Sequence, residues 1–596
     1  MIEVRQARGT DERSEAGHLQ AQWARLLLGS LADAGVCEVV ISPGSRSTPF
    51  VLAAAADRRL RCHRFVDERS AAFFALGQAR ASGRPSLLLC TSGTAGAHYL
   101  PAVIEASASF VPLLVLTADR PVELAACGAN QTIDQLKLFG DHARQFFDLG
   151  TADGRPEALR ALRRTAAQAV LRTTYPEPGA VHLNARARKP LEPVASDTEP
   201  SRVDRLLATP IARPAAPELR PSPAAIEALA AACAGTPKGL IVCGPAPLEQ
   251  ARCAPRVAEL SARTGFPILA EAASQLRFRP RSSPGLYVDA FDLLLDRAAF
   301  RRLHRPELVV QIGRPATSGA WGRYLAENAG VDHWVLSPHG WLDAESTATA
   351  LCFADLEPTL AGLLERLPER GAQSAWAEAF RRAEGLAWQA AGEVLAACSG
   401  LSEGVVAREA VAALPAGGLL AVGNSLPIRQ VDRYCQGGGV EVGVVSQRGV
   451  SGIDGLVSGA AGAAAASRRP TLALVGDLSL LHDLSGLAAV ARLGTAFAVV
   501  AVNNGGGRIF EQLPLAEQTA ARPHLDLWLN PHGLDFRAAA SLYGLAYREA
   551  EDRQALRRAL AAAFGGGQAC LIEARVRPHG AAEEIGALRR RLEGAA

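Results

Sequence analysis

The sequence lacks long apolar runs. None of its hydrophobic stretches approaches the roughly 18 residues that a membrane-spanning helix needs, so we expect no membrane span. The first residues, MIEVRQARGTDERSEAGH, carry acidic side chains and no apolar core, so we also expect no secretory signal.

Closely spaced cysteines are also absent. The 11 cysteines are scattered, and even the nearest ones, such as Cys233, Cys243 and Cys253, are ten positions apart. This spacing fits neither a CxxC metal clip nor a disulfide framework. The odd number indicates reduced thiols, and we predict a cytoplasmic protein.

Lysine is nearly missing, since Lys137, Lys189 and Lys238 are the only three among 63 basic residues. A net charge of +3, with 48% hydrophobic and 21% charged residues, is typical of globular proteins and argues against a disordered chain or a nucleic-acid partner. A GC-rich genome alone would also produce this bias toward arginine, so single arginines prove little; still, the guanidinium presents a fork of donors that suits carboxylate ligands better than an ammonium group does.

What is present is a chain of 596 residues, too long for one hydrophobic core. Apolar runs such as CEVVISPG, SLLLCTSG and PLLVLTAD alternate with helical patterns, which indicates parallel βαβ units. We predict an α/β protein with three open parallel sheets: a first domain at 18–190, a proline-rich linker at 191–223, a central domain at 224–395 and a third at 396–596. The first and third domains share no residue-level repeat, so any duplication would be structural.

Two apolar strands of the third domain end in polar residues. TLALVGD ends at Asp477, AFAVVAVNN ends at Asn504, and LSGLAAVARLG between them can supply a crossover helix. Ligands bind beyond the carboxyl ends of parallel strands. Carboxylate and amide oxygens suit Mg²⁺ or Ca²⁺, and Gly505 and Gly506 let the backbone approach closely. Each ending alone is also an ordinary strand exit, but the two together predict a metal and diphosphate site.

This pair resembles the metal and diphosphate signature of the thiamine-diphosphate enzymes. In that superfamily a pyrimidine-binding domain comes first and a diphosphate-binding domain last, often with a central domain between them. The resemblance implies thiamine diphosphate held through Mg²⁺ or Mn²⁺, with Asp477, Asn504 and Gly506 as metal ligands and Leu478 and Ser479 beside the cofactor.

The resemblance also implies a glutamate in the first domain, and CHRFVDERSAAFFALGQA supplies Glu68. Such a glutamate hydrogen-bonds the aminopyrimidine ring and favours the tautomer that takes the proton from the thiazolium carbon. Ile453, in GVSGIDG, matches the apolar wedge that bends the cofactor. From local sequence alone, Asp67-Glu68-Arg69 is equally well a charged helix N-terminus.

Further motifs make the resemblance more specific, and together they extend over nearly the whole chain from about residue 18. ISPGSRSTPF, TSGTAGAHYLPAVIEA, LTADRPVEL, CGANQTIDQ, VGNSLPIR, RGVSGIDGL and NNGGGRIFEQLP are similar to those of the 2-succinyl-5-enolpyruvyl-6-hydroxy-3-cyclohexene-1-carboxylate synthases of menaquinone and phylloquinone biosynthesis. The implied reaction decarboxylates 2-oxoglutarate and adds the succinyl-semialdehyde carbanion to isochorismate.

Both implied substrates carry two carboxylates, which arginines can hold through paired hydrogen bonds. By resemblance, the residues facing isochorismate are Ser45, Arg46, Arg120, Asn130 and Gln131, those facing the succinyl part are Ser425, Arg429 and Arg448, and an apolar wall is formed by Ile509, Phe510 and Leu513. Each arginine could instead be a solvated surface charge, and the wall could be ordinary core packing.

One motif departs from the family. Its central domain often offers a basic pair to isochorismate, whereas PATSGAWGRYL here places Ala320 and Trp321 near that position, with Arg323 further on. Two rival hypotheses stay open, namely a pyruvate-type decarboxylase or carboligase of the same superfamily, and a catalytically silent binding protein of the same fold. The resemblance further implies a homodimer or homotetramer with its active site at the subunit interface.

Overall fold

The computed structural model describes residues 2–192, 201–281, 285–369 and 374–594. Part of the predicted linker, 193–200, lies outside the described residues. The chain forms two compact units. The first unit contains Met1–Pro217 and Gln447–Ser467, and the second contains Glu218–Ser446 and Arg468–Ala596.

The first unit is built on a six-stranded parallel sheet with the order β2-β1-β3-β4-β6-β5. Its strands are β1 (Glu38–Ile41), β2 (Arg61–Arg64), β3 (Ser86–Cys90), β4 (Leu113–Asp119), β5 (Ala143–Asp148) and β6 (Ala180–Arg186). Its helices are α1 (Ile2–Asp33), α2 (Thr48–Ala56), α3 (Glu68–Ser82), α4 (Leu100–Ala108), α5 (Pro156–Arg172), α6 (Arg202–Leu207) and α16 (Leu456–Ser467).

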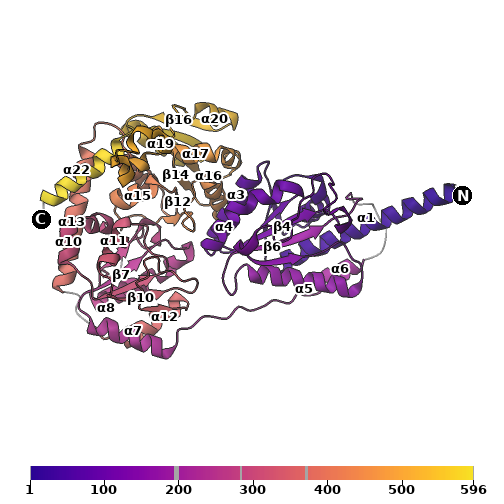
Figure 1. Ribbon diagram of the computed structural model, residues 1–596, viewed down its shortest axis with the longest axis horizontal. Helices are drawn as coiled ribbons and strands as arrows, with labels where there is room; N and C mark the ends of the chain where they lie inside the picture. Colours follow the sequence, from indigo (N-terminus) through magenta and orange to yellow (C-terminus); the bar gives the residue numbers. More distant parts are fainter. Residues whose placement is uncertain (1, 193–200, 282–284, 370–373, 595–596) are drawn as a thin grey trace. The chain divides into compact units, whose positions relative to one another are not determined.

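The central strands β3 and β4 are buried along their whole length, as expected for a parallel sheet covered by helices on both faces. Apolar residues of α1, α2, α5 and α6 form one core with the sheet. Figure 1 shows α5 and α6 alongside α1 in this unit. The helix predicted from Gln20 onward extends N-terminally to Ile2.

Helix α16 comes from the last third of the sequence but packs on α3 in the first unit. A Cβ atom added at Gly77 would lie 1.9 Å from the carbonyl oxygen of Gly459, and one at Gly462 would lie 1.9 Å from that of Phe74. The two backbones approach so closely that only glycine fits at these crossings. This explains the run of small residues in LVSGAAGAAAAS.

The second unit contains two sheets, both parallel. The central sheet has the order β11-β10-β9-β7-β8. Its strands are β7 (Gly239–Cys243), β8 (Ile268–Ala270), β9 (Leu308–Ile312), β10 (Asp332–Leu336) and β11 (Ala350–Cys352). Its helices are α7 (Pro223–Gly235), α8 (Ala254–Thr264), α9 (Phe291–Asp296), α10 (Ala298–Leu303), α11 (Gly319–Glu327), α12 (Leu356–Arg366) and α13 (Ala375–Ala396).

The last sheet has the order β13-β12-β14-β15-β17-β16. Its strands are β12 (Leu419–Val422), β13 (Gly443–Val445), β14 (Thr471–Gly476), β15 (Phe497–Asn503), β16 (Ala546–Ala550) and β17 (Cys570–Arg575). Its helices are α14 (Glu403–Ala413), α15 (Leu426–Tyr434), α17 (Asp477–His482), α18 (Leu487–Val490), α19 (Asp526–Leu529), α20 (Arg537–Leu542), α21 (Arg553–Gly565) and α22 (Gly580–Gly594).

The first and last sheets follow the same strand order when each is numbered from its own first strand. The prediction of an α/β protein with three open parallel sheets is therefore confirmed, and the duplication is structural. The crossover between β14 and β15 differs from the single helix expected. It consists of α17, a 3₁₀ turn at Leu484–Gly486 and the four-residue α18, in keeping with the poor helix propensity of Ser485 and Gly486.

Within the described ranges, no helix is both long enough and apolar enough to cross a membrane.

Candidate active site

The candidate metal site lies at the carboxyl edge of the last sheet. Strands β14 and β15 pair in parallel with Gly476 opposite Val502, so Asp477 and Asn504 leave the sheet at the same edge. The strand order reverses between β12 and β14, and this is the topological switch point at which open α/β sheets bind ligands. The predicted meeting of these two strand ends is thus observed.

Asp477 joins the two strand ends. The residue is 2% exposed. Its Oδ2 accepts hydrogen bonds from the backbone N–H of Asn504 at 3.2 Å and of Gly506 at 2.9 Å, and its Oδ1 accepts one from Leu478 at 2.7 Å. One carboxylate therefore fixes the loop after β15 relative to the start of α17. Ser479, the next predicted cofactor residue, is buried in the same turn.

Asn504 supplies an oxygen that fits a cation. Its Nδ2 donates to Glu403 Oε1 at 2.8 Å, which orients the amide. Its Oδ1 is buried and has no hydrogen-bond partner among the described residues. A buried carbonyl oxygen left in this way loses free energy unless a ligand or water satisfies it. The donor set of Asp477 and Asn504 therefore fits a hard divalent cation.

Gly506 completes the loop in a conformation that favours glycine, with φ of +137°. A Cβ atom there would lie 2.4 Å from the carbonyl oxygen of Leu529. The carbonyl oxygen of Gly506 accepts the N–H of Arg508 at 2.9 Å and keeps a second lone pair. The described residues contain no cluster of three His, Cys, Asp or Glu side chains that could hold a metal, so a site here needs amide and backbone oxygens beside the Asp477 carboxylate.

Two residues beside the site were not predicted from the sequence. His532 Nε2 lies 3.2 Å from Asp477 Oδ2. Glu403 begins α14 and is nearly fully buried, and burial raises its pKa to about 7, an effect that the hydrogen bond from Asn504 opposes. No local motif marks either residue, because each reaches the site only through the fold.

Ser425 and Arg429 belong to the N-terminal part of α15, which follows β12. Ser425 precedes the helix with φ of +70°, a strained conformation for a non-glycine residue, and its carbonyl oxygen accepts from Arg429 Nη1 at 2.6 Å. Strain of this kind concentrates at functional sites.

Arg429 lines a cavity of about 510 Å³ in the second unit. Ile509 and Leu513 of the predicted apolar wall also line it, whereas Phe510 is not among its lining residues. Ala320 and Arg323 of the central domain reach the same cavity, and Arg323 forms an ion pair with Asp296 at 2.7 Å. Trp321 is buried in the core instead.

In the first unit, Glu68 is the first residue of α3. The Asp67 side chain caps this helix by accepting the N–H of Arg69 at 2.9 Å. The Glu68 side chain is half-buried and makes no hydrogen bond or ion pair with any described residue. Its charge adds to burial in raising the pKa values of Cys90 and Tyr99, so these side chains lie near it. The position of Glu68 at the start of α3 is therefore compatible with its predicted contact to the cofactor.

The residues predicted to face isochorismate gather at the carboxyl edge of the first sheet. Arg46, in a 3₁₀ turn (Ser45–Ser47) after β1, is 5% exposed, and Arg120, after β4, is 8% exposed. Burial lowers the pKa of Arg46, the positive charge of Arg120 lowers it further, and the buried carboxylate of Asp119 opposes this fall. Arg120 Nη2 donates to the Asn130 carbonyl at 3.0 Å, and Gln131 Nε2 donates to the Ser92 carbonyl at 3.0 Å. Two buried guanidinium groups close enough to repel suit an anionic ligand.

Arg448 and Ile453 lie in the loop before α16, also in the first unit. Glu105 of α4 holds this loop, because its two carboxylate oxygens accept the N–H groups of Gly449 at 3.0 Å and Val450 at 2.8 Å. The Glu105 carboxylate is buried and also pairs with Arg80 at 2.9 Å. No local motif predicts this contact, because it spans more than 300 positions.

Family models match both ends of the chain. The thiamine pyrophosphate enzyme N-terminal TPP binding domain matches residues 22–138, and the corresponding C-terminal TPP binding domain matches residues 444–574. Benzoylformate decarboxylase from Polynucleobacter necessarius has a similar fold, with a TM-score of 0.69, 17% identity, and coverage of 93% of this chain and 98% of that chain. The fold and the two domain matches define the class, the thiamine pyrophosphate enzymes.

Three relatives identify one particular family within this class. The 2-succinyl-5-enolpyruvyl-6-hydroxy-3-cyclohexene-1-carboxylate synthase of Sorangium cellulosum (strain So ce56) is 48% identical, over 96% of this chain and 95% of its own length. Proteins of the same name from Myxococcus xanthus (strain DK1622) and Haloarcula marismortui are 40% and 39% identical, over 94% and 92% of this chain and 95% and 93% of their own lengths. The chain belongs to the family of the 2-succinyl-5-enolpyruvyl-6-hydroxy-3-cyclohexene-1-carboxylate synthases.

Proposed function

We propose that this enzyme decarboxylates 2-oxoglutarate with thiamine diphosphate and joins the remaining four-carbon unit to isochorismate, giving 2-succinyl-5-enolpyruvyl-6-hydroxy-3-cyclohexene-1-carboxylate and CO₂. Menaquinone or phylloquinone biosynthesis would consume this product. The single observation that carries the proposal is the buried Oδ1 of Asn504 beside Asp477, which has no hydrogen-bond partner in the part of the chain that the structure describes. This oxygen fits the cation that anchors a diphosphate in the class to which the chain belongs.

In this proposal Asp477, Asn504 and the Gly506 carbonyl hold Mg²⁺ or Mn²⁺, and Leu478 and Ser479 lie beside the diphosphate. Bound thiamine diphosphate would supply the electron sink that decarboxylation requires. Glu68 has no competing partner among the described residues and would hydrogen-bond the aminopyrimidine ring. Ile453 would support the bent cofactor from below.

Recognition of the substrates would rest on arginines. Arg429 faces a cavity of about 510 Å³, large enough for a small dicarboxylate, and would bind the distal carboxylate of 2-oxoglutarate. Ser425 and Arg448 would assist it, and Ile509 and Phe510 would exclude water. The residues we assign to isochorismate are Ser45, Arg46, Arg120, Asn130 and Gln131.

We further propose a cytoplasmic homodimer or homotetramer in which the active site forms between subunits. We also propose that the first domain ends at residue 190, the linker at residue 223 and the central domain at residue 395.

The test is to incubate the protein with isochorismate, 2-oxoglutarate, thiamine diphosphate and Mg²⁺ and to identify the adduct by mass spectrometry. A parallel assay compares release of labelled CO₂ from 2-oxoglutarate and from pyruvate. Pyruvate lacks the distal carboxylate that Arg429 would bind, so we expect little release from it. A preference for pyruvate would replace this assignment with a pyruvate-type enzyme, and failure to release CO₂ from either would favour a silent binding protein.

A further inference from the structure

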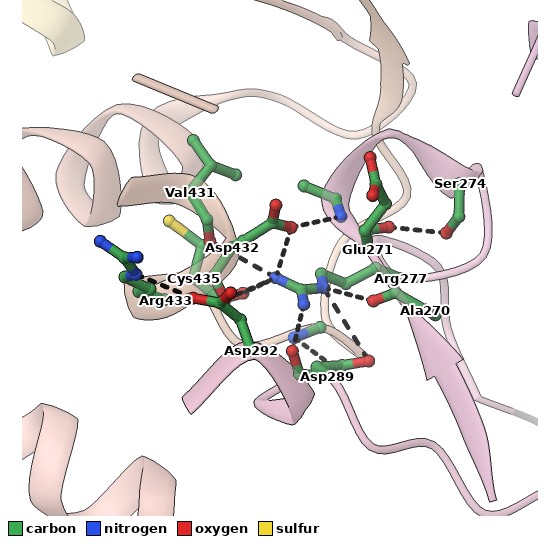
Figure 2. Close-up of polar contacts among 12 residues, drawn as sticks. Ala270, Glu271, Ser274, Arg277, Asp289, Asp292, Val431, Asp432, Arg433 and Cys435 are labelled. Atoms are coloured by element: carbon green, nitrogen blue, oxygen red, sulfur yellow. Dashed lines mark hydrogen bonds and ion pairs between the residues drawn. The ribbon is translucent and has the colours of Figure 1, made fainter. Parts of the chain in front are cut away.

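Helix α15 contributes to the cavity at its N-terminal end and is fastened to the central domain at its C-terminal end. Arg429 and Arg433 are four positions apart, so they lie on the same face of the helix, and both line the cavity. The last turn of α15 meets a buried polar cluster from the segments 270–277 and 289–292 (Figure 2). One end of this short helix therefore carries the proposed substrate-binding arginine, and the other end is anchored to the central domain.

Arg277 is the centre of this cluster and is fully buried. Its Nη1 donates to the main-chain carbonyl of Asp432 at 2.9 Å and, over longer distances of 3.4 Å, to those of Val431 and Cys435. These carbonyls belong to the last turn of α15 and its C-cap residue Cys435, where helical carbonyls run out of N–H partners; the carbonyl of Val431 also accepts the N–H of Cys435 at 3.0 Å. The cation thus caps the helix at its negative end.

The same guanidinium is tied to the central domain. Its Nε donates to the carbonyl of Ala270, at the end of β8, at 3.0 Å, and its Nη2 donates to the carbonyl of Asp289. The carboxylate of Asp432 lies 3.4 Å from Arg277 (Figure 2). It also accepts the N–H of Ala272 at 2.7 Å. Burial raises the pKa of Asp432, and the charge of Arg277 opposes that rise.

A second ion pair fastens the face of α15 that carries Arg429. Arg433 Nε lies 2.8 Å from Asp292 Oδ2, and Asp292 also accepts a hydrogen bond from Ser318, the N-cap of α11. Asp292 is buried, yet the charges of Arg433 and Arg429 contribute to a lowered pKa for its carboxyl group. Arg429 therefore lies within electrostatic reach of the cluster that holds its helix.

We propose that Arg277 is a positioning residue for substrate recognition, because by holding the last turn of α15 it fixes where Arg429 enters the cavity. This inference rests on the proposed role of Arg429 toward 2-oxoglutarate. It gives the central domain a part in binding although Ala320 and Trp321 stand where the family often has a basic pair.

The test compares Arg277→Lys with the matched control Arg281→Lys. Arg281 also pairs with Asp289 but makes no hydrogen bond to α15 within the described residues. A lysine at 277 keeps the charge but cannot reach the carbonyls of both segments together. Asp432→Asn is a milder second variant, since it keeps the shape of the side chain and can still accept the N–H of Ala272.

We expect Arg277→Lys to raise the KM for 2-oxoglutarate about tenfold, because even a displacement of about 1 Å in a positioning group can cost about a hundredfold. The affinity for thiamine diphosphate should stay unchanged, and Arg281→Lys should alter neither quantity. In an Arg429→Ala background, Arg277→Lys should raise the KM no further. An equal rise in both backgrounds would overturn the inference, as would equal losses for substrate and cofactor.

Hydrogen exchange of the amides in 426–434 supplies a readout that needs no turnover. Faster exchange in Arg277→Lys and Asp432→Asn than in Arg281→Lys is expected, and unchanged exchange would overturn the positioning role. If the wild-type protein releases no CO₂ from 2-oxoglutarate, the proposed function fails. The exchange data would then still decide whether Arg277 holds α15.

Discussion

Replacing Gly506 with alanine should damage the candidate metal site more than the same change at its neighbour Gly505. At Gly506 the new Cβ atom would lie 2.4 Å from the Leu529 carbonyl oxygen, whereas ordinary contacts begin near 3.4 Å. The loop must therefore move by about 1 Å, the difference between these distances. At Gly505, the nearest atom to an added Cβ lies 3.8 Å away, on the Arg508 side chain.

Both glycines have positive φ, +137° at Gly506 and +77° at Gly505, so both alanine variants carry backbone strain. For Gly505→Ala we expect a loss of about 1 kcal/mol in the free energy of unfolding. For Gly506→Ala the strain costs about 1–3 kcal/mol. Displacement also weakens the 2.9 Å bond from the Gly506 N–H to Asp477, which adds about 1 kcal/mol. The expected total loss in the free energy of unfolding for Gly506→Ala is about 2–4 kcal/mol.

Urea unfolding of the apoprotein measures the stabilities, and titration with thiamine diphosphate in the presence of Mg²⁺ measures cofactor affinity. Because Asn504 lies two positions before Gly506, we expect Gly506→Ala to weaken cofactor binding by about ten- to a hundredfold, as disturbed outer contacts of metal ligands do. Similar cofactor affinity in the two alanine variants would refute the proposed geometry of the metal site.

Three further predictions address other parts of the site. Glu68→Gln should bind thiamine diphosphate but slow hydrogen exchange at the thiazolium carbon by about a hundredfold or more, and a near-normal rate would contradict its role. Arg429→Ala should raise the KM for 2-oxoglutarate about ten- to a hundredfold through loss of charged hydrogen bonds, with cofactor affinity as the control, and equal losses would place Arg429 elsewhere. Glu403 has a pKa raised from 4.5 to about 7 by burial, so its contribution makes the apoprotein most stable below pH 4.5 and less stable as the pH rises to 7. The loss amounts to about 3 kcal/mol. Glu403→Gln should therefore show a flatter dependence of the unfolding free energy on pH, and an unaltered slope would contradict the raised pKa of Glu403.

The features predicted well from sequence are those encoded locally. Apolar runs ending in Asp477 and Asn504 identified two adjacent buried strands, because the end of a parallel strand is marked by its own residues. The motif around Arg120, Asn130 and Gln131 likewise identified residues that the first unit brings together. The resemblance to a family added the order of the domains.

The features that were not predicted depend on contacts between distant segments. Nothing in the sequence around Arg277 shows that it caps a helix more than 150 positions later. Glu403 and Glu105 look like ordinary helix surface charges until the fold buries them. Trp321 stands in the sequence near the position of the family's basic pair but packs in the core, since a helix presents successive residues to different sides.

The placement of α16 has a consequence for dissecting the molecule. The polypeptide passes from one unit to the other three times, after Pro217, after Ser446 and after Ser467. A protease nick after Ser446 or after Ser467 therefore leaves the two bodies covalently tethered through Pro217, whereas a nick after Pro217 leaves residues 1–217 joined to α16 by packing alone. A gene fragment ending at Pro217 would encode a truncated body with the apolar flank of α3 bare to solvent, so we expect such a fragment to be insoluble unless a peptide spanning 447–467 is supplied alongside it.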